Sequence, residues 1–150
     1  MKIFKKELIK LDYYALDKKS CLQDMVDFLY QDKILSEPDQ FLASILEREK
    51  LMSTGIGRGI AIPHARSSNV SRLRIIVFVL ENELDFDAID GEPVKILFMI
   101  AVPEDMKQEY MKVLSQLSNF CKEADNRDKL LSARNQSEIY ELLKRIENEV

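Results

Sequence analysis

The residues best suited to chemistry lie in the segment Ser53–Ser68, STGIGRGIAIPHARSS. His64 is the only histidine of the chain, and three of the four glycines, Gly55, Gly57 and Gly59, lie in the same segment. Neutral imidazole is a nucleophile near pH 7, because its ordinary pKa is about 6.5. One imidazole beside a glycine-bearing backbone indicates a site where an anion binds or reacts.

The charge around this segment supports an anion as the ligand. The window Leu51–Leu80 contains no Asp or Glu, although the chain carries 26 acidic residues. The same window contains four arginines, Arg58, Arg66, Arg72 and Arg74. Phosphate is the anion that best matches this combination, because backbone N–H groups and arginine forks are its usual ligands in proteins.

Two other kinds of site fit the sequence poorly. A zinc site needs three or four ligands, whereas the chain offers one histidine and two cysteines that are distant in sequence, and no CxxC motif. A serine hydrolase of the common type needs GxSxG, which is absent. We therefore expect no metal and no cofactor. Phosphoryl transfer to His64 needs only one histidine, with donors from backbone N–H groups, the Thr54 hydroxyl and an arginine.

Two simpler interpretations stay open on spacing alone. His64 can be an ordinary loop or core histidine, and the three glycines can serve only to shape a tight turn, because GxGxG is a weak motif.

The composition sets further bounds. A chain of 150 residues with 46% hydrophobic and 32% charged residues predicts a single domain, residues 1–150. A net charge of −4 argues against a nucleic-acid partner. Neither a signal peptide nor a membrane span is expected, so we predict a cytoplasmic protein in which Cys21 and Cys121 are buried thiols.

The elements that must position these residues follow from hydrophobic periodicity. Two nearly continuous apolar runs, LRIIVFVL and VKILFMIAV, predict strands that are covered on both faces. The expected strands are an edge strand or extended arm within 1–16, then 60–62, 73–80 and 94–102. The expected helices are one from 17 or 20 to 30, then 36–50, 108–124 and a last one from 135 or 137. A charged break and a short segment ending at 132 separate the last two helices. This order predicts an α/β fold, with Ser53–Ser68 as a loop that contains the strand 60–62.

Three segments resemble a known family. They are Glu47–His64 (EREKLMSTGIGRGIAIPH), Leu84–Val94 (LDFDAIDGEPV) and the strand that ends in Val102-Pro103. Together they resemble the IIA domain of the phosphoenolpyruvate-dependent sugar phosphotransferase system (PTS), in its fructose, mannitol and nitrogen-regulatory form, EIIA type 2. The resemblance covers nearly the whole chain. It implies a single α/β domain with a mixed β-sheet and helices on both faces.

The resemblance also implies a function and site residues. His64 would accept a phosphoryl group from phosphorylated HPr and pass it to a cysteine of a IIB component, with the membrane involved only through IIC. Arg48 would neutralise the phosphoryl group, and Thr54 stands where the family keeps a small hydroxyl. We expect a backbone carbonyl to hold the other ring nitrogen of His64. The alternative is a regulatory nitrogen-type EIIA, in which phosphorylation controls partner binding.

One residue departs from the family pattern. Many members carry a second histidine in a sequence like Glu-His-x-x-x-Leu, whereas this chain has Glu109-Tyr110 and, four residues later, Leu114. A tyrosine can donate a hydrogen bond to a phosphoryl oxygen but takes no positive charge. Tyr110 is therefore a candidate phosphate ligand, and the alternative is that it belongs to the apolar face of its helix.

Overall fold

Two long apolar strands form the centre of the molecule. The computed structural model describes residues 1–150, and in it β5 (Arg74–Leu84) pairs antiparallel with β6 (Val94–Pro103). Alternate residues of β5 enter different cores, with Ile75 and Val77 on one face and Ile76 on the other. Period-2 alternation with both faces apolar requires cover on both sides of the sheet.

The sheet is mixed and has six strands, in the order β1-β5-β6-β3-β2, with β4 also paired to β6. β1 (Ile9–Tyr13) lies parallel to β5 at one edge. On the far side of β6, β3 (Ile60–Ala61) and β4 (His64–Ser67) follow one another, both parallel to β6. The edge strand predicted near the N-terminus is confirmed.

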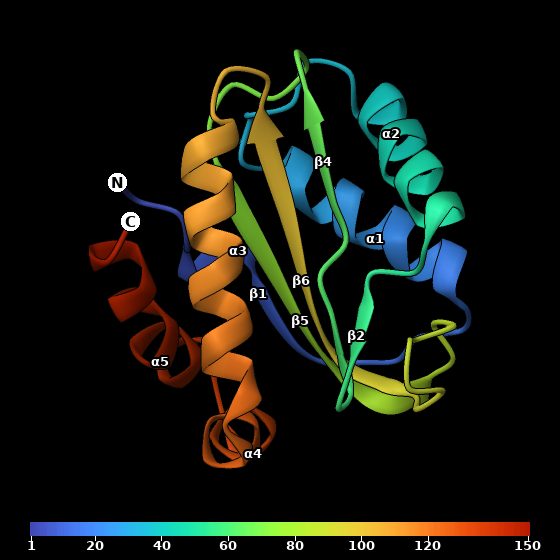
Figure 1. Ribbon diagram of the computed structural model, residues 1–150, viewed down its shortest axis with the longest axis vertical. Helices are drawn as coiled ribbons and strands as arrows, with labels where there is room; N and C mark the ends of the chain where they lie inside the picture. The colour runs from blue at the N-terminus through green and yellow to red at the C-terminus, as the bar shows by residue number, and fades with distance from the viewer.

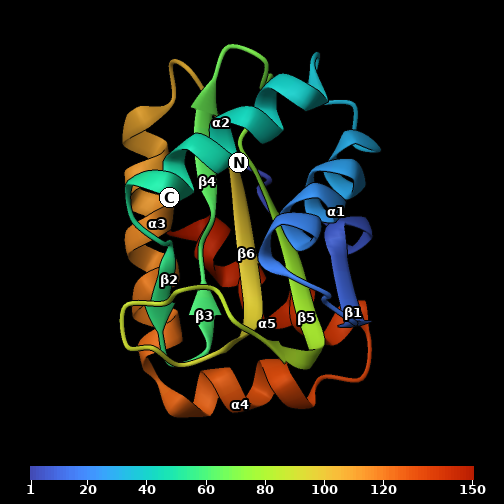
Figure 2. The ribbon, with the colours of Figure 1, turned by 90° about the vertical axis from the view of Figure 1, so that its right-hand side faces the viewer.

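Helices cover the two faces of this sheet (Figures 1 and 2). α1 (Lys18–Tyr30) and α2 (Pro38–Leu51) pack on one face. α3 (Lys107–Lys122), α4 (Ala124–Ser132) and α5 (Gln136–Asn148) cover the other, and a 3-10 turn, Lys6–Leu8, precedes β1. The predicted α/β fold with a mixed sheet between two helical layers is confirmed.

The side chains of Asp17 and Asn135 accept hydrogen bonds from Ser20 N and Glu138 N and so cap the N-termini of α1 and α5. Ser36 does not cap α2, although its type predicts a cap. It lies one residue before the N-cap, Glu37, and its hydroxyl contacts Asn69.

The glycine segment differs from the predicted loop. β2 (Gly55–Gly57) pairs antiparallel with β3 and forms a hairpin. Gly57 and Gly59 flank its turn with φ of 101° and 81°, a region that favours glycine. β4 was also absent from the prediction, because HARS has no apolar alternation. It forms because four of its residues pair with the central strand β6.

The two cysteines, Cys21 and Cys121, are free and buried, as predicted, and burial raises the pKa of each thiol to about 12. None of the helices combines the length and the apolar character that crossing a membrane requires.

Candidate active site around His64

The position of His64 is set by an interruption in the pairing along β6, between β3 and β4. β3 pairs with Ile96 and Leu97 and β4 resumes the pairing at Ile100, so the two residues between them, Ile62 and Pro63, lie outside the ladder. Proline has no N–H to donate to a ladder, so an interruption is expected there. The break leaves His64 as the first residue of β4, half-buried beside α2 and α3.

One ring nitrogen of His64 is committed to the backbone. Nδ1 lies 2.8 Å from the carbonyl oxygen of Ile62. A carbonyl oxygen only accepts, so Nδ1 carries the proton and Nε2 keeps its lone pair. The expected carbonyl partner is thus present, and it belongs to Ile62. Nε2 is therefore the nucleophilic atom of the neutral ring.

The surroundings of His64 favour its neutral form. Burial lowers the pKa of the imidazole, and the nearby Arg48 guanidinium lowers it further. The hydrogen bond to Ile62 and the charge of Glu49 act in the opposite direction but do not outweigh burial. The ring is therefore neutral near pH 7, with one nitrogen free of a proton, as a nucleophile requires.

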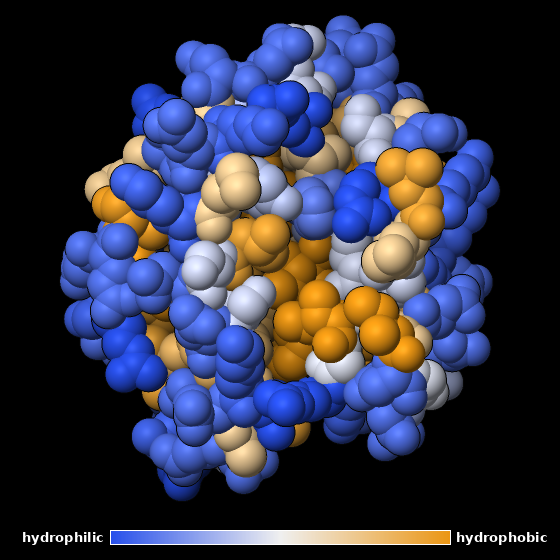
Figure 3. All heavy atoms as spheres, in the orientation of Figure 1, coloured by the Kyte–Doolittle hydropathy of each residue, from blue (hydrophilic) through white to orange (hydrophobic).

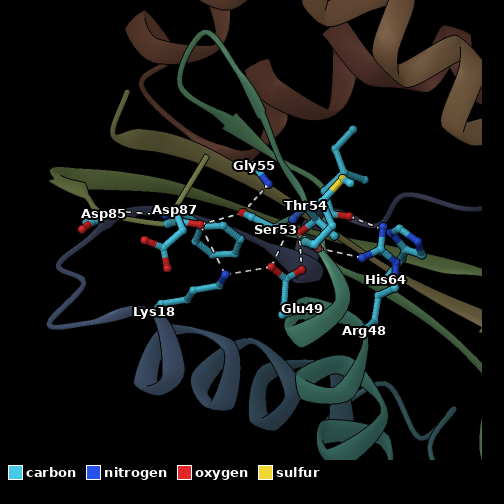
Figure 4. A network of polar contacts seen from close by, with 12 residues as sticks. Lys18, Arg48, Glu49, Ser53, Thr54, Gly55, His64, Asp85 and Asp87 are labelled. Carbon is cyan, nitrogen blue, oxygen red and sulfur yellow. Dashed lines mark hydrogen bonds and ion pairs between the residues drawn. The ribbon is translucent and has the colours of Figure 1, made fainter. Parts of the chain in front are cut away.

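Arg48 reaches the site from the last turn of α2 and lies beside His64 (Figure 4). Its Nη1 donates to the carbonyl oxygen of Met52 over 2.8 Å, which fixes the guanidinium while other N–H groups stay unpaired within the chain. Its charge acts on both His64 and Tyr110. The structure therefore brings these three predicted site residues together.

Tyr110 forms the opposite side of the site, from the first turn of α3. Its ring centroid lies 5.3 Å from that of His64, at an interplanar angle of 35°. Burial raises the pKa of its hydroxyl, so the phenol is protonated and can donate at neutral pH. The ring packs against the apolar core on that face, and the hydroxyl makes no hydrogen bond within the chain. The packing of the ring agrees with a place on the apolar face of α3, and the role of the hydroxyl as a phosphate ligand stays a prediction.

Thr54 lies in the site region but its hydroxyl points elsewhere. Thr54 is buried, and its hydroxyl donates to a carboxylate oxygen of Glu49, while its backbone N–H donates to the other oxygen over 3.1 Å. The single hydroxyl proton is therefore used, because a buried carboxylate needs donors. Thr54 sits near His64 through its backbone rather than as a free donor.

The N–H group of Gly55 and two of the four window arginines bind other partners. Gly55 N–H donates to Ser53 Oγ over 3.0 Å. Arg74 is buried and donates to Asp32 over 3.0 Å, and Arg58 donates to the Lys122 carbonyl at the end of α3 over 3.2 Å. The arginine whose charge reaches His64 is Arg48, which precedes the window. The inferred positive surround is therefore wrong for Arg74, whose charge is paired with Asp32, whereas Arg58 lines a groove beside β2 and α3.

Sequence reasoning missed two residues of this region, Glu49 and Lys18. Glu49 is 9% exposed and pairs with Lys18 Nζ over 2.9 Å (Figure 4). A glutamate in the last turn of a helix opposes the helix dipole, and this was the available signal. No such signal was available for Lys18, because it lies 31 positions from Glu49 and starts another helix.

An apolar hollow lies on the face shown in Figure 3, between β2 and the second half of α3. A groove of about 350 Å³ runs between these elements, and its apolar lining is Ile56, Ile60 and Cys121. Ile60 and Ile62 are buried in the core, whereas Ile56 is 43% exposed. Of the three isoleucines near His64, Ile56 is thus the one available at the surface.

Residues 2–146 match the family described as the phosphoenolpyruvate-dependent sugar phosphotransferase system, EIIA 2. The chain is 35% identical over 131 residues to a nitrogen regulatory protein of Pseudomonas aeruginosa, covering 87% of this chain and 85% of the relative. It is 34% identical over 137 residues to the fructose-specific EIIA component of a PTS from Haloferax volcanii, covering 91% and 89%.

A solved structure agrees with these relatives. The nitrogen regulatory protein IIA-Ntr of Neisseria meningitidis superposes with a TM-score of 0.89 at 31% identity, covering 94% of this chain and 96% of that one. Sequence and fold thus agree over nearly the whole length, including the segment that bears His64. The chain belongs to the EIIA type 2 family of the phosphoenolpyruvate-dependent sugar phosphotransferase system.

Proposed function

We propose that this protein is a phosphohistidine carrier that takes a phosphoryl group from phosphorylated HPr onto Nε2 of His64 and passes it to a cysteine of a IIB component. The observation that supports this most directly is the bond from Nδ1 to the Ile62 carbonyl, which leaves Nε2 as the nucleophile. The depressed pKa of His64 adds to it, because the ring needs no deprotonation before it attacks.

The proposed step is a displacement at phosphorus. The Nε2 lone pair forms the N–P bond while the bond from phosphorus to the HPr donor atom breaks, and that electron pair returns to HPr. The imidazole gains positive character, which the Ile62 carbonyl stabilises through Nδ1–H. Arg48 can pair with the phosphoryl oxygens, and Tyr110 can donate to one of them. Transfer to the IIB thiolate reverses the step, with the electron pair returning to Nε2.

An apolar groove on the molecule suits transient partners. It lies between β2 and the second half of α3, the helix that carries Tyr110, and the exposed side chain of Ile56 adds to it. HPr and IIB must each place a reacting atom within reach of Nε2, so both are expected to use the same face in turn. Exposed apolar surface of this kind commonly marks a protein-binding site.

Incubation with phosphoenolpyruvate, enzyme I and HPr, followed by intact mass measurement, tests the proposal. We expect an acid-labile gain of one phosphoryl group that requires HPr and is lost in His64→Ala. The control is Arg134→Met, an exposed change between α4 and α5, which should keep the gain. No mass gain, or a gain that survives His64→Ala, contradicts the proposal.

The role after phosphorylation has two candidates. A fructose-specific EIIA component and a nitrogen regulatory protein are similar to this chain at nearly equal identity. We propose the sugar-transport role, with control of partner proteins by the phosphorylation state as the alternative. Loss of the phosphoryl group to a fructose- or mannitol-type IIB domain, on its cysteine, supports the transport role. A phosphohistidine that stays on His64 in the presence of such IIB domains supports the regulatory one.

A further inference from the structure

Glu49 is an acidic residue in an unfavourable place. It is 9% exposed and lies in the last turn of α2, where burial and the helix dipole both oppose a negative charge. It is held there by donors from two segments, Lys18 Nζ at 2.9 Å and, from Thr54, the backbone N–H at 3.1 Å and the hydroxyl. A carboxylate held this way fixes the segments that bind it.

Two further hydrogen bonds connect Thr54, which Glu49 holds, to the imidazole of His64. The carbonyl oxygen of Thr54 accepts from the backbone N–H of Ile62 over 2.9 Å. The carbonyl oxygen of Ile62 accepts from Nδ1 of His64 over 2.8 Å. The N–H of Ile62 makes no bond to β6, so its bond to the Thr54 carbonyl is the hydrogen bond that ties Ile62 to the segment that Glu49 holds.

Lys18 extends the same network to the loop after β5. Its Nζ lies 3.3 Å from the Phe86 carbonyl oxygen and 4.3 Å from the centroid of the Phe86 ring. Ser53 Oγ donates to the same carbonyl over 2.6 Å and accepts from Gly55 N–H. The residues on either side of Thr54 are therefore anchored, and the anchor includes α1, α2 and the loop at Phe86 (Figure 4).

We infer that Glu49 is a positioning residue for the reaction at His64: it fixes Thr54, and through Thr54 and Ile62 it holds the imidazole in the tautomer and orientation that present Nε2. Glu49 does not take a proton or contact the phosphoryl group in this role. The consequence for rate rests on the proposed function, whereas the consequence for the tautomer does not.

A purely structural role for Glu49 makes a different prediction. A buried ion pair stabilises a fold no better than well-packed apolar residues, and replacing both charges is often neutral. If Glu49 served only stability, the tautomer of His64 would not depend on it. If Glu49 positions the ring, its loss changes the tautomer even where stability is restored by removing Lys18 as well.

The test is ¹⁵N NMR of the imidazole in the unphosphorylated protein, at a pH where the ring is neutral. Signals need no assignment, because His64 is the only histidine. In the native chain we expect the Nδ1–H form to dominate. In Glu49→Gln we expect the Nε2–H form to rise to a comparable population. The matched control is Glu47→Gln, two residues away on the same helix, whose side chain is 74% exposed and pairs only with Lys50.

Glu49→Gln leaves Lys18 without its partner and can lower stability. The double variant Lys18→Met/Glu49→Gln removes that unpaired charge and is measured beside it. The tautomer shift should appear in both variants. An unchanged tautomer in the double variant overturns the inference, even if the melting temperature falls.

Single-turnover phosphorylation by phosphorylated HPr gives the second measurement. We expect the maximal rate to fall about tenfold in Glu49→Gln, from misplacement of the nucleophile, while the half-saturating HPr concentration stays unchanged. A rise in the half-saturating concentration with an unchanged maximal rate would contradict positioning. If the native protein accepts no phosphoryl group, the proposed function fails, and a tautomer shift still supports positioning of the ring by Glu49.

Discussion

The two sides of the imidazole of His64 are built differently. On the side of α2 and β2, Glu49 binds Thr54 and Lys18, and Ser53 binds the Phe86 carbonyl, so nearly every polar group has a partner. On the side of α3, Tyr110 approaches the imidazole with its ring, and its hydroxyl makes no hydrogen bond within the chain. One side is fixed by polar contacts and the other is held by apolar packing alone.

This difference separates two requirements of group transfer. The nucleophile must be oriented before the reaction, and a fixed network does this without reorganisation. The incoming phosphoryl group needs donors that are still unpaired when it arrives. The free N–H groups of Arg48 and the hydroxyl of Tyr110 meet this second need. Each side therefore supplies one residue with an unpaired donor, and the side of α2 also holds the fixed network. The following substitutions test these roles, from the largest expected effect to the smallest.

Removing the guanidinium of Arg48 should have the largest effect. Arg48→Met should slow phosphoryl transfer to His64 by about 10²–10³-fold, the effect of losing one charged donor in an active site. Arg48→Lys should slow it about tenfold, because an ammonium keeps the charge but lacks the planar fork. Quenched-flow phosphorylation followed by intact mass measures both. Arg134→Met is the control, an exposed change between α4 and α5, and a rate within twofold of native in Arg48→Met would contradict the assignment.

Crowding the fixed side should destabilise it. A Cβ at Gly55 would lie 2.8 Å from the Cβ of Ala88, so Gly55→Ala should lower the free energy of unfolding by about 1–3 kcal/mol. Urea denaturation measures this change. Adding Ala88→Gly removes one of the two atoms in conflict and should recover part of the loss. A Gly55→Ala variant as stable as the native chain would show that the backbone around Gly55 and Ala88 moves to make room for the added methyl group.

The protonation of His64 should respond with opposite signs to two neighbouring residues of α2, Arg48 and Glu49. Its NMR titration midpoint should lie below the ordinary value of about 6.5, because burial and Arg48 disfavour the imidazolium. Arg48→Met removes a positive charge and should raise the midpoint, whereas Glu49→Gln removes a negative charge and should lower it. A midpoint at or above the ordinary value in the native chain would contradict the burial of this ring.

The same shift links His64 to stability. As the pH falls below about 6.5, the unfolded chain takes up the proton before the folded one, so the free energy of unfolding should decrease. The part due to His64 is the difference between the native chain and His64→Ala across this pH range. Stability that rises on acidification relative to His64→Ala would have the wrong sign.

The hydroxyl on the open side should matter least. Tyr110→Phe should slow phosphoryl transfer by no more than about fivefold, the effect of one hydrogen bond of about 1 kcal/mol. Tyr110→Ala removes the ring as well and should slow transfer further. A loss in Tyr110→Phe larger than that in Arg48→Lys would reverse the comparison, since the open side would then supply the main donor.

Much of this architecture could be predicted because it rests on local pattern. The apolar runs around Val77 and Phe98 predicted the central strands, and helical periodicity predicted four of the five helices. The exception is α4, whose charged sequence was interpreted as a break. β4 could not be predicted, because its pairing depends on β6, more than 30 positions later. The hairpin at Gly55–Gly57 was taken for a loop for the same reason, since a glycine strand has no apolar alternation and forms only against β3.

The amino-acid sequence alone was enough to predict the family, the α/β fold and His64 as the candidate nucleophile, because these predictions depend on local periodicity and on a long block of residues around the single histidine. The tertiary structure decided which groups act together. It directed Arg58 and Arg74 to other partners, turned Thr54 toward Glu49 and joined Lys18 to that carboxylate. Hydrogen bonds and ion pairs between distant segments depend on distances of a few ångströms, and spacing along the chain does not specify them.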